Sequence, residues 1–511
     1  MSGNDTSASS LRPFQSSLCP CPFSLVAFGL CLIPFVLLAT LNSAGYRYGA
    51  SDQAFYIPAV LKRLDPALFP RDGALIESQA RLTVVDEAIA LVARATGLSL
   101  PVLFAGAYLA ALVLLAWGAA SLGALLYRTP WAVAALLAAL TLRHAITKSG
   151  TNTLEGYFHP RQLAFAFGVL AVAWFLRGSL VRPAVLVAVA FLIHSTTASW
   201  FGVWLVVATF VAERRARVPL GAAAVPVVAV AVWAIVFGPL SGRLTRFDPA
   251  WLETLSRKDY LFALDWPATT WLVNLAYIPV ILWAYRRRTL AGIAIQREKA
   301  LVIGCLTLAV IFAGFLPFHA AGVALAIQLQ PARVFWMLDL LAVVYVVWMA
   351  AEGVRRPTRR AQATAAVLIA LSVVRGTYLL AVRFPDRQVA AIWIADNDWG
   401  RVMAWARTTD PGAAWLADPL HAARYGTSVR VAGERDVLVE EGKDTAIGMY
   451  DRGIAMRVRE RLVAVGDFAT ITPARCRELA ATYALTYLVT DRVMDLPVAF
   501  QSGTLHVYAL R

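Results

Sequence analysis

The chain has 511 residues, of which 59% are hydrophobic and only 15% charged. Its mean hydropathy is +0.62, and its apolar runs approach the ~20 residues that cross a hydrocarbon core, which argues against a soluble protein. The formal net charge is +15, but lysines and arginines form short clusters between apolar runs, which argues against a nucleic-acid-binding face. The sequence therefore predicts an integral membrane protein in a lipid bilayer, with no nucleic acid as partner.

Residues 1–22 are polar, and an apolar run follows at 23–41. That run is longer than a signal-peptide core of ~7–15 residues and lacks a small-x-small cleavage site, so we expect a retained first transmembrane helix. The chain has five cysteines, and no second pair accompanies Cys19 and Cys21. We therefore expect neither a zinc site nor a disulfide framework.

Apolar runs divide most of the chain into about eleven candidate spans, which predicts a polytopic α-helical transmembrane domain over residues 1–382. The expected spans are 23–41, 100–126, 131–146, 160–176, 183–194, 198–212, 219–238, 268–285, 300–317, 332–351 and 361–382.

The loops between these spans alternate in character. Short, arginine-rich loops follow every second span, whereas the others are mostly longer and mixed in charge. Because positive charge accumulates in cytoplasmic loops, we expect a cytoplasmic N-terminus and an external C-terminus. The basic loops hold Arg128, Arg177 with Arg182, residues 213–217, residues 286–299 and residues 355–360; the mixed loops are 42–99, 147–159, 195–197, 239–267 and 318–331.

The spans at 183–194 and 198–212 are unusually close together. Only about 30 residues separate Arg182 from Glu213, which allows two short helices at 1.5 Å per residue. The turn at His194 would then lie below the outer surface, where polar backbone needs protein or a water-filled cavity around it. A single long tilted helix with a hydrogen-bonded His194 is the alternative.

Two segments outside the spans are expected to carry structure. The first outer loop, 42–99, has apolar residues at helical spacing, which predicts amphipathic helices along the membrane surface. Residues 383–511 have the composition of a small soluble extracytoplasmic α/β domain. It lacks a Gly-rich phosphate loop, a Gly-x-Ser-x-Gly motif and a His/Cys cluster, so we expect recognition or scaffolding from it rather than chemistry. Its expected strands are 413–417, 428–439, 487–490, 498–500 and 505–510, and its expected helices are 399–407, 448–463 and 472–484.

A carboxylate flanked by aromatic residues follows the first span, in the stretch Gly45–Tyr56. An acid at the membrane edge is a functional candidate, because one without a role costs free energy and is easily replaced. Asp52 is therefore the first candidate site residue, with helix capping as the structural alternative.

Two expected helix starts carry a proline and an arginine on the same side of the membrane. One contains His159-Pro160-Arg161, and the other is the run Gln328–Arg333. Helix N-termini expose unpaired N–H groups and a positive dipole, so basic side chains there make an anion site. We expect a phosphate or diphosphate clamp, with snorkelling of arginine to the interface as the alternative.

Two charges lie deeper in the expected spans. Asp339 and Arg375 are each about seven residues from the outer end of their span, hence near 10 Å in depth. An isolated charge at that depth costs several kcal/mol, and pairing removes most of that cost. We therefore expect a structural intramembrane pair between them.

The whole layout resembles the type C (GT-C) superfamily of polytopic membrane glycosyltransferases, which includes oligosaccharyltransferase catalytic subunits, protein O-mannosyltransferases and aminoarabinose transferases. The likeness lies in the cytoplasmic N-terminus, the early acid in a long first outer loop, the short helices and the C-terminal α/β domain. The chain is also similar to uncharacterised bacterial members with a Gly-x-Ser-Asp-Gln-like loop, here Gly49–Gln53, and a His-Pro-Arg turn, here His159–Arg161.

The resemblance implies an inner-membrane enzyme of bacteria that moves a sugar, with inversion, from a polyprenyl-phosphate donor to an unidentified periplasmic acceptor. Asp52 would be the base that takes the acceptor's proton, its pKa raised in a cavity shielded from water. His159, Arg161 and Arg333 would hold the leaving phosphate, with His194 as a further contact.

One feature departs from the family pattern, because many members carry two adjacent acids in the first loop and here Gln53 follows Asp52. We therefore expect no tightly bound metal or other cofactor, and Asp65 and Asp72 are the candidates for a second acid. Two other classes compete with the enzyme. One is a transporter or flippase of a lipid-linked or anionic solute, which predicts inverted repeats; the other is a non-catalytic envelope assembly protein.

Overall fold

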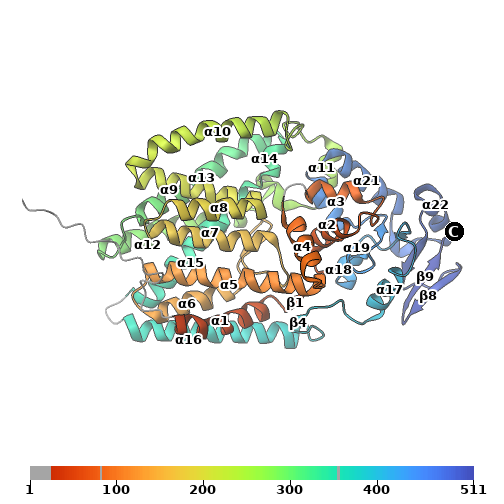
Figure 1. Ribbon diagram of the computed structural model, residues 1–511, viewed down its shortest axis with the longest axis horizontal. Coiled ribbons are helices and arrows are strands. Elements are labelled where there is room, and N and C mark those ends of the chain that lie inside the picture. Colours follow the sequence, from red (N-terminus) through yellow and green to blue (C-terminus); the bar gives the residue numbers. More distant parts are fainter. Residues whose placement is uncertain (1–24, 81–82, 354–356, 511) are drawn as a thin grey trace, which may run out of the picture.

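The computed structural model describes residues 25–80, 83–353 and 357–510, so the predictions for residues 1–22, with Cys19 and Cys21, lie outside the described chain. The described part is mostly helical. Figure 1 shows long helices side by side in a bundle, a smaller part with a β-sheet at one end of it, and short helices between the two.

Each apolar segment predicted as a span contains a helix. Seven helical stretches of the described chain are long and apolar enough to cross a membrane, whereas four further apolar helices are shorter. The shortest, α6, has 12 residues and would reach only about 18 Å. The bundle helices are α1 (Leu25–Asn42), α5 (Leu100–Leu126), α6 (Pro130–Thr141), α7 (Pro160–Leu176), α8 (Val181–Ile193), α9 (Ser195–Ala212), α10 (Arg217–Val236), α12 (Ala268–Leu290), α13 (Glu298–Ala320), α15 (Val334–Glu352) and α16 (Pro357–Tyr378).

The basic loops meet at the end of the bundle away from the sheet (Figure 1). Arg288 donates from Nη1 to the carbonyl oxygen of Leu126 at 3.0 Å. Arg297 donates from Nη1 to the carbonyl oxygen of Phe175 at 3.0 Å and forms an ion pair with Glu213. The loops that follow α5, α7, α9 and α12 therefore lie together, and successive bundle helices run in opposite directions.

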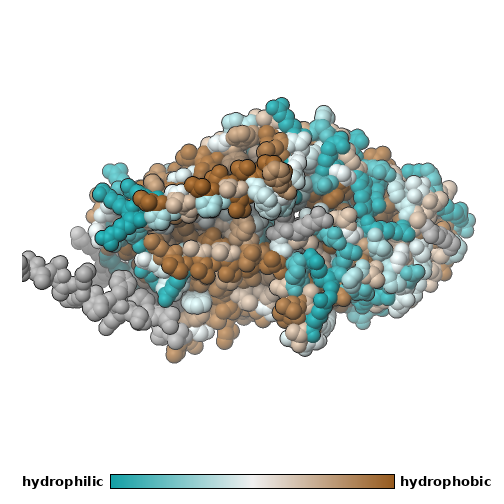
Figure 2. Space-filling model, turned by 45° about the horizontal axis from the view of Figure 1, so that its top comes forward, coloured by the Kyte–Doolittle hydropathy of each residue, from teal (hydrophilic) through white to brown (hydrophobic). Residues whose placement is uncertain are grey.

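The exposed surface of the bundle is apolar. Figure 2 shows hydrophobic side chains over the helices and hydrophilic ones near their far end and over the C-terminal part. Helix α10 buries none of its residues, and Val225 is 71% exposed on it. Large exposed apolar surfaces mark a partner or a membrane rather than water.

The helices α8 and α9 form the expected pair of short helices. They pack against each other, and the chain leaves helical geometry at His194, with φ −153° and ψ 92°. The imidazole Nδ1 of His194 accepts from the backbone N–H of Thr197 at 3.3 Å and so caps α9. The two-helix interpretation is confirmed, and the single long helix is wrong.

A mixed five-stranded sheet in the order β6-β5-β7-β9-β8 forms the centre of the C-terminal part. Side chains alternate across a strand, so Trp415 packs on the face covered by α17, whereas Leu416 packs on the face covered by α21 and α22. The sheet therefore lies between two helix layers. Its strands are β5 (Ala414–Leu416), β6 (Asp436–Val437), β7 (Tyr487–Thr490), β8 (Val498–Ser502) and β9 (Leu505–Ala509), and the helices here are α17 (Asp398–Ala406), α18 (His421–Tyr425), α19 (Val429–Ala432), α20 (Glu441–Gly448), α21 (Arg452–Val465) and α22 (Pro473–Tyr483), with the 3₁₀ turn η6 (Phe468–Thr470).

Two predictions for this part have opposite outcomes. The helix at 472–484 is confirmed as α22, with Thr472 accepting from the N–H of Arg475 at 3.2 Å. The strand at 428–439 is wrong, because Ser428 accepts from the N–H of Val431 at 3.2 Å and starts the short helix α19 instead. Only β6 of that segment is extended.

The first outer loop contains α2 (Gln53–Leu64), α3 (Gly73–Ala80) and α4 (Val85–Thr96). The expectation that these helices lie along a membrane surface stays a prediction, and two of them make contacts that the sequence did not predict. Helix α2 packs against α19 and α3 packs against α20 of the C-terminal part. Only α4 has a largely exposed apolar face, with Leu91 at 68%.

Short elements complete the chain and link its parts. The strand β1 (Tyr46–Arg47) pairs in parallel with β4 (Ala390–Ala391), and β2 (Ala145–Ile146) pairs antiparallel with β3 (Thr151–Asn152). The others are α11 (Pro249–Leu255), α14 (Ala324–Gln328), the 3₁₀ turns η1 (Arg214–Ala216), η2 (Asp259–Leu261), η3 (Ala263–Asp265) and η4 (Pro331–Arg333), and the π turn η5 (Leu379–Arg383).

Candidate functional site

The segment that carries Asp52 is fixed by backbone contacts with a second loop. The N–H of Arg47 donates to the carbonyl oxygen of Gly156 at 2.8 Å. A Cβ at Gly156 would lie 2.5 Å from the carbonyl oxygen of Gly45, so only glycine permits this approach. Gln53 donates to the carbonyl oxygen of Phe158 at 3.2 Å. These contacts place Asp52 directly beside the His-Pro-Arg turn.

Asp52 stands at the N-cap position of α2, but its side chain makes no capping hydrogen bond. The carboxylate instead contacts three basic side chains. Its Oδ2 lies 3.1 Å from Nε2 of His159 and 3.7 Å from Nη2 of Arg161, and its Oδ1 lies 2.7 Å from Nζ of Lys443. Simple helix capping therefore does not account for this acid.

His159 has one available tautomer in this arrangement. It is the N-cap of α7, with Pro160 next, and its Nδ1 accepts from the backbone N–H of Arg161 at 3.1 Å. The hydrogen of a neutral ring is then on Nε2, which donates to Asp52. Burial, together with the positive charge of Arg161, lowers the pKa of His159 to about 4, so the ring is neutral at pH 7.

Asp52 is an ionised carboxylate at neutral pH. Burial by itself would raise its pKa, but the charge of Lys443, the hydrogen bond from His159 and the charge of Arg161 together hold the pKa of Asp52 well below its usual range. The expectation of a raised pKa is therefore wrong. The pKa of Asp52 is lowered chiefly by the charge of Lys443. No feature of the first loop predicts that this lysine is nearby.

Arg161 is held by an acid on its own loop. Its Nη2 lies 2.7 Å from Glu155, and its Nη1 donates to the carbonyl oxygen of Gly150 at 2.9 Å. Its Nε is buried without a hydrogen-bond partner among the described residues. This arginine is thus oriented rigidly, with donor capacity left over.

Arg333 is the second buried arginine of the site, in η4 ahead of α15. It is 7% exposed, and its Nε has no hydrogen-bond partner within the described chain. Arg333 and Arg161 are close enough to interact electrostatically, and both act on His194. The ring centroids of His194 and His159 are 6.2 Å apart. The structure thus brings together the residues predicted to bind phosphate.

Three tyrosines are near both Asp52 and Arg333. Each interacts electrostatically with both charges, and burial raises the pKa of each, so their hydroxyl groups remain neutral donors. They are Tyr56, Tyr260 and Tyr450. A polar ligand between Asp52 and Arg333 would therefore meet hydroxyl donors as well as charges.

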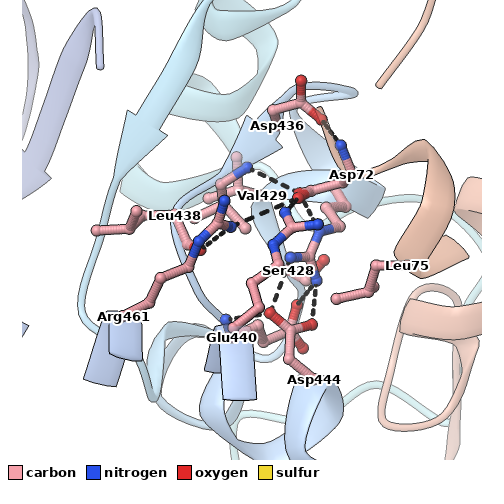
Figure 3. A network of polar contacts seen from close by, with 12 residues as sticks. Asp72, Leu75, Ser428, Val429, Asp436, Leu438, Glu440, Asp444 and Arg461 are labelled. Carbon is pink, nitrogen blue, oxygen red and sulfur yellow. Dashed lines mark hydrogen bonds and ion pairs between the residues drawn. The ribbon is translucent and has the colours of Figure 1, made fainter. Parts of the chain in front are cut away.

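The two candidates for a second acid are corrected by the structure. Asp65 is exposed and ends α2, the helix that Asp52 begins, so about 18 Å of helix separates them. Asp72 is 1% exposed and accepts from Nε of Arg430 at 2.7 Å, with Arg457 and Arg461 also beside it. Figure 3 shows this carboxylate inside a network of C-terminal residues. Asp72 holds the first loop against the C-terminal part.

The expected pair of Asp339 and Arg375 is also corrected. Asp339 lies 3.5 Å from Nδ1 of His144, whereas Arg375 donates to the side-chain oxygen of Asn42 at 2.8 Å. Each charge has a polar partner of its own, supplied by a loop or a helix end that apolar patterning does not reveal.

Lys443 is the charged partner of Asp52 that sequence reasoning missed, as it also missed the three tyrosines. It belongs to α20 of the C-terminal part, for which no chemistry was expected, and it is 391 positions away from Asp52. No local motif marks it. Within the described residues, no three of His, Cys, Asp and Glu gather as metal ligands would, and the expectation of no tightly bound metal stays a prediction.

The fold and the site together define a helical bundle that carries a mixed-charge polar centre at one end, covered by an α/β unit. Comparison with protein-family models and with curated protein sequences found no match to this chain. The functional conclusion therefore rests on the geometry of the site.

Proposed function

We propose that this chain is an integral membrane glycosyltransferase that moves a sugar from a polyprenyl-phosphate donor to an acceptor at the outer face of a bacterial inner membrane. The single observation that carries this proposal is the meeting of an ionised Asp52 with His159, Arg161 and Lys443, together with a buried Arg333 that interacts electrostatically with Arg161. An ionised Asp52 is free to accept a proton, and buried cations that lack full compensation suit a phosphate leaving group.

The membrane location is supported by the apolar surface of the bundle and by the separation of its two ends. The basic loops meet at one end, and the site with the C-terminal part lies at the other. Positive loops favour the cytoplasm. We infer about eleven membrane crossings, a cytoplasmic N-terminus and an external C-terminal domain.

The proposed reaction begins with the acceptor hydroxyl beside Asp52. Its oxygen attacks the anomeric carbon of the donor while its proton passes to the Asp52 carboxylate. The bond from the anomeric carbon to the phosphate oxygen breaks, and polyprenyl phosphate leaves with one additional negative charge. Because the attack comes opposite the leaving group, the configuration inverts.

Charge balance supports the roles of the two arginines. Lys443, Arg161 and Arg333 are cationic, whereas the acids of the site are Asp52 and Glu155. A phosphate that gains negative charge in the transition state is stabilised more than the ground state by such preorganised donors. The neutral His159 donates a hydrogen bond from Nε2 to the Asp52 carboxylate and thereby orients the base.

An apolar cavity supports a lipid-linked donor. It has a volume of about 750 Å³ and lies between α8, α9 and the start of α10. Its wall follows α8 as far as Leu192, two positions before His194. A prenyl chain in this cavity would bring its phosphate toward the buried cations of the site.

The test uses the full chain in proteoliposomes with polyprenyl-phosphate mannose and polyprenyl-phosphate glucose, each labelled in the sugar, and with a periplasmic extract as the source of the acceptor. We expect release of free polyprenyl phosphate from at least one donor, and its loss in Arg333→Gln. No release with either donor, together with movement of the intact lipid across the bilayer, would reject the enzyme and favour a flippase.

A further inference from the structure

A second polar cavity lies next to Asp52, between the first loop and the C-terminal domain. Its volume is about 430 Å³, which is within the usual ~300–1,000 Å³ of small-ligand sites. Its wall combines the end of β1 with the loop before α2, the loop before η2, the linker after η5, and α18 and α20. The polar side chains of the wall are Arg47, Ser51, Lys258, Arg387, Glu440 and Lys443.

The four cations of this wall stand in two like-charged pairs. Burial and the neighbouring Arg387 lower the pKa of Arg47 to about 10, and burial and the neighbouring Lys443 lower that of Lys258. Holding like charges together costs free energy unless an anion joins them. The folded chain therefore keeps positive charge here in the absence of a bound ligand.

The two arginines have incomplete partners, whereas Lys443 is paired with Asp52 and Lys258 donates to the carbonyl oxygen of Gly442 at 2.7 Å. The Nε of Arg47 is buried and unpaired within the described chain, and the guanidinium of Arg387 stacks 3.6 Å from the ring centre of Phe384. The one acid of the wall does not neutralise the arginines. Both oxygens of Glu440 are buried without a hydrogen-bond partner in the described chain, and its Oε2 lies 3.8 Å from Nη1 of Arg430, which is outside the wall. Burial raises the pKa of Glu440 to about 7.

We propose that this cavity binds the anionic group, a phosphate or a carboxylate, of a small water-soluble ligand. The groups that would recognise it are the guanidinium groups of Arg47 and Arg387 and the ammonium groups of Lys258 and Lys443, which all line the cavity.

The position of the cavity gives the bound group a role, and this step rests on the proposed sugar transfer. Lys443 contacts both Ser51 of the cavity wall, at 3.4 Å, and Asp52, at 2.7 Å. Ser51, which lines the cavity, directly precedes Asp52. A ligand whose anionic group is bound in the cavity would thus be able to place a hydroxyl group beside Asp52. The ligand would be the acceptor, and the acceptor would be anionic.

The test is calorimetric binding to the full chain in nanodiscs, with glucose 6-phosphate, glucuronate and methyl glucoside as probes. We expect at least one of the two anions to bind with a Kd of about 1 mM or tighter and methyl glucoside at least about tenfold more weakly. Binding of glucose 6-phosphate alone assigns the anion as phosphate, and binding of glucuronate alone assigns it as carboxylate.

Matched variants locate the binding. Arg387→Gln should weaken anion binding about tenfold, Arg387→Lys should restore most of it, and Arg383→Gln should leave it unchanged. Arg383 is four positions away, exposed and outside the wall. Equal weakening by Arg387→Gln and Arg383→Gln, or equal affinity for methyl glucoside, would overturn the proposal.

The outcomes for this cavity and for the transfer reaction are separable. Failure of both anions to bind at about 10 mM, with sugar transfer intact, would reject the cavity alone. Anion binding that Arg387→Gln weakens, in a chain that releases no polyprenyl phosphate, would keep the cavity and reject the transferase.

Discussion

At the scale of single residues, His159 has two tasks in one ring. Its Nδ1 caps α7 and its Nε2 donates to Asp52. The capping task requires the neutral ring, because Nδ1 must keep its lone pair, and burial lowers the pKa of His159 to about 4. When the ring gains a proton at low pH, Nδ1 can no longer accept the hydrogen bond that caps α7.

This arrangement predicts a pH-dependent stability. An unfolded histidine protonates near pH 6.5, whereas folded His159 does so near pH 4. Between these values the unfolded state binds the extra proton, so stability falls as pH drops, by up to about 3 kcal/mol. Thermal unfolding of the purified chain between pH 7 and pH 4 measures this loss.

The matched variant is His159→Asn, because asparagine is a good N-cap and does not titrate. We expect the pH slope of this variant to be shallower than that of the wild type. Identical slopes over this pH range would contradict the assignment of a neutral, capping His159.

At the scale of elements, Asp72 joins the segment before α3 to the C-terminal domain through the Arg430 guanidinium. Asp72→Asn would remove a negative charge that compensates the buried Arg430 guanidinium. This loss costs about 3 kcal/mol or more of stability. We expect the linker 384–397 to be cut by trypsin about 100-fold faster, because undocking exposes it. Asp495→Asn, an exposed change in the same domain, should have no such effect, and equal rates for the two would count against this account.

The deep charges of the bundle give a second prediction at this scale. Since Asp339 contacts His144 and Arg375 contacts Asn42, the losses of stability in Asp339→Asn and Arg375→Gln should add within about 0.5 kcal/mol in the double variant. Thermal unfolding in detergent of the three variants measures this. If the double variant is as stable as the less stable of the two single variants, Asp339 and Arg375 form a direct ion pair after all.

At the scale of the whole molecule, the two ends of the bundle should face opposite compartments. In a chain with its natural cysteines replaced, we expect Ala469→Cys to react with an impermeant maleimide on intact cells, and Ala291→Cys to react only after lysis. Both positions are exposed. Ala469 belongs to the C-terminal domain and Ala291 to a basic loop, so the reverse pattern would invert the proposed topology.

The apolar runs were sufficient to predict the helices, because length and composition alone define a segment such as α5 or α7. The same holds for the His159-Pro160 helix start, where local capping chemistry decides. Contacts between distant segments could not be predicted. Lys443 meets Asp52 across most of the chain, and Asp72 was placed in the wrong role because its partner Arg430 belongs to a segment predicted as a strand.

The central claim is that Asp52 is the base of a transfer reaction, and one matched pair tests it most directly. Release of polyprenyl phosphate from labelled donor is measured, with a periplasmic extract as the source of the acceptor, in proteoliposomes that hold wild type, Asp52→Asn or Asp65→Asn. We expect Asp52→Asn to lose about 10²–10⁴-fold in rate and Asp65→Asn, at the far end of α2, to match the wild type. Wild-type rates in Asp52→Asn, in a chain that retains its fold, would contradict the claim.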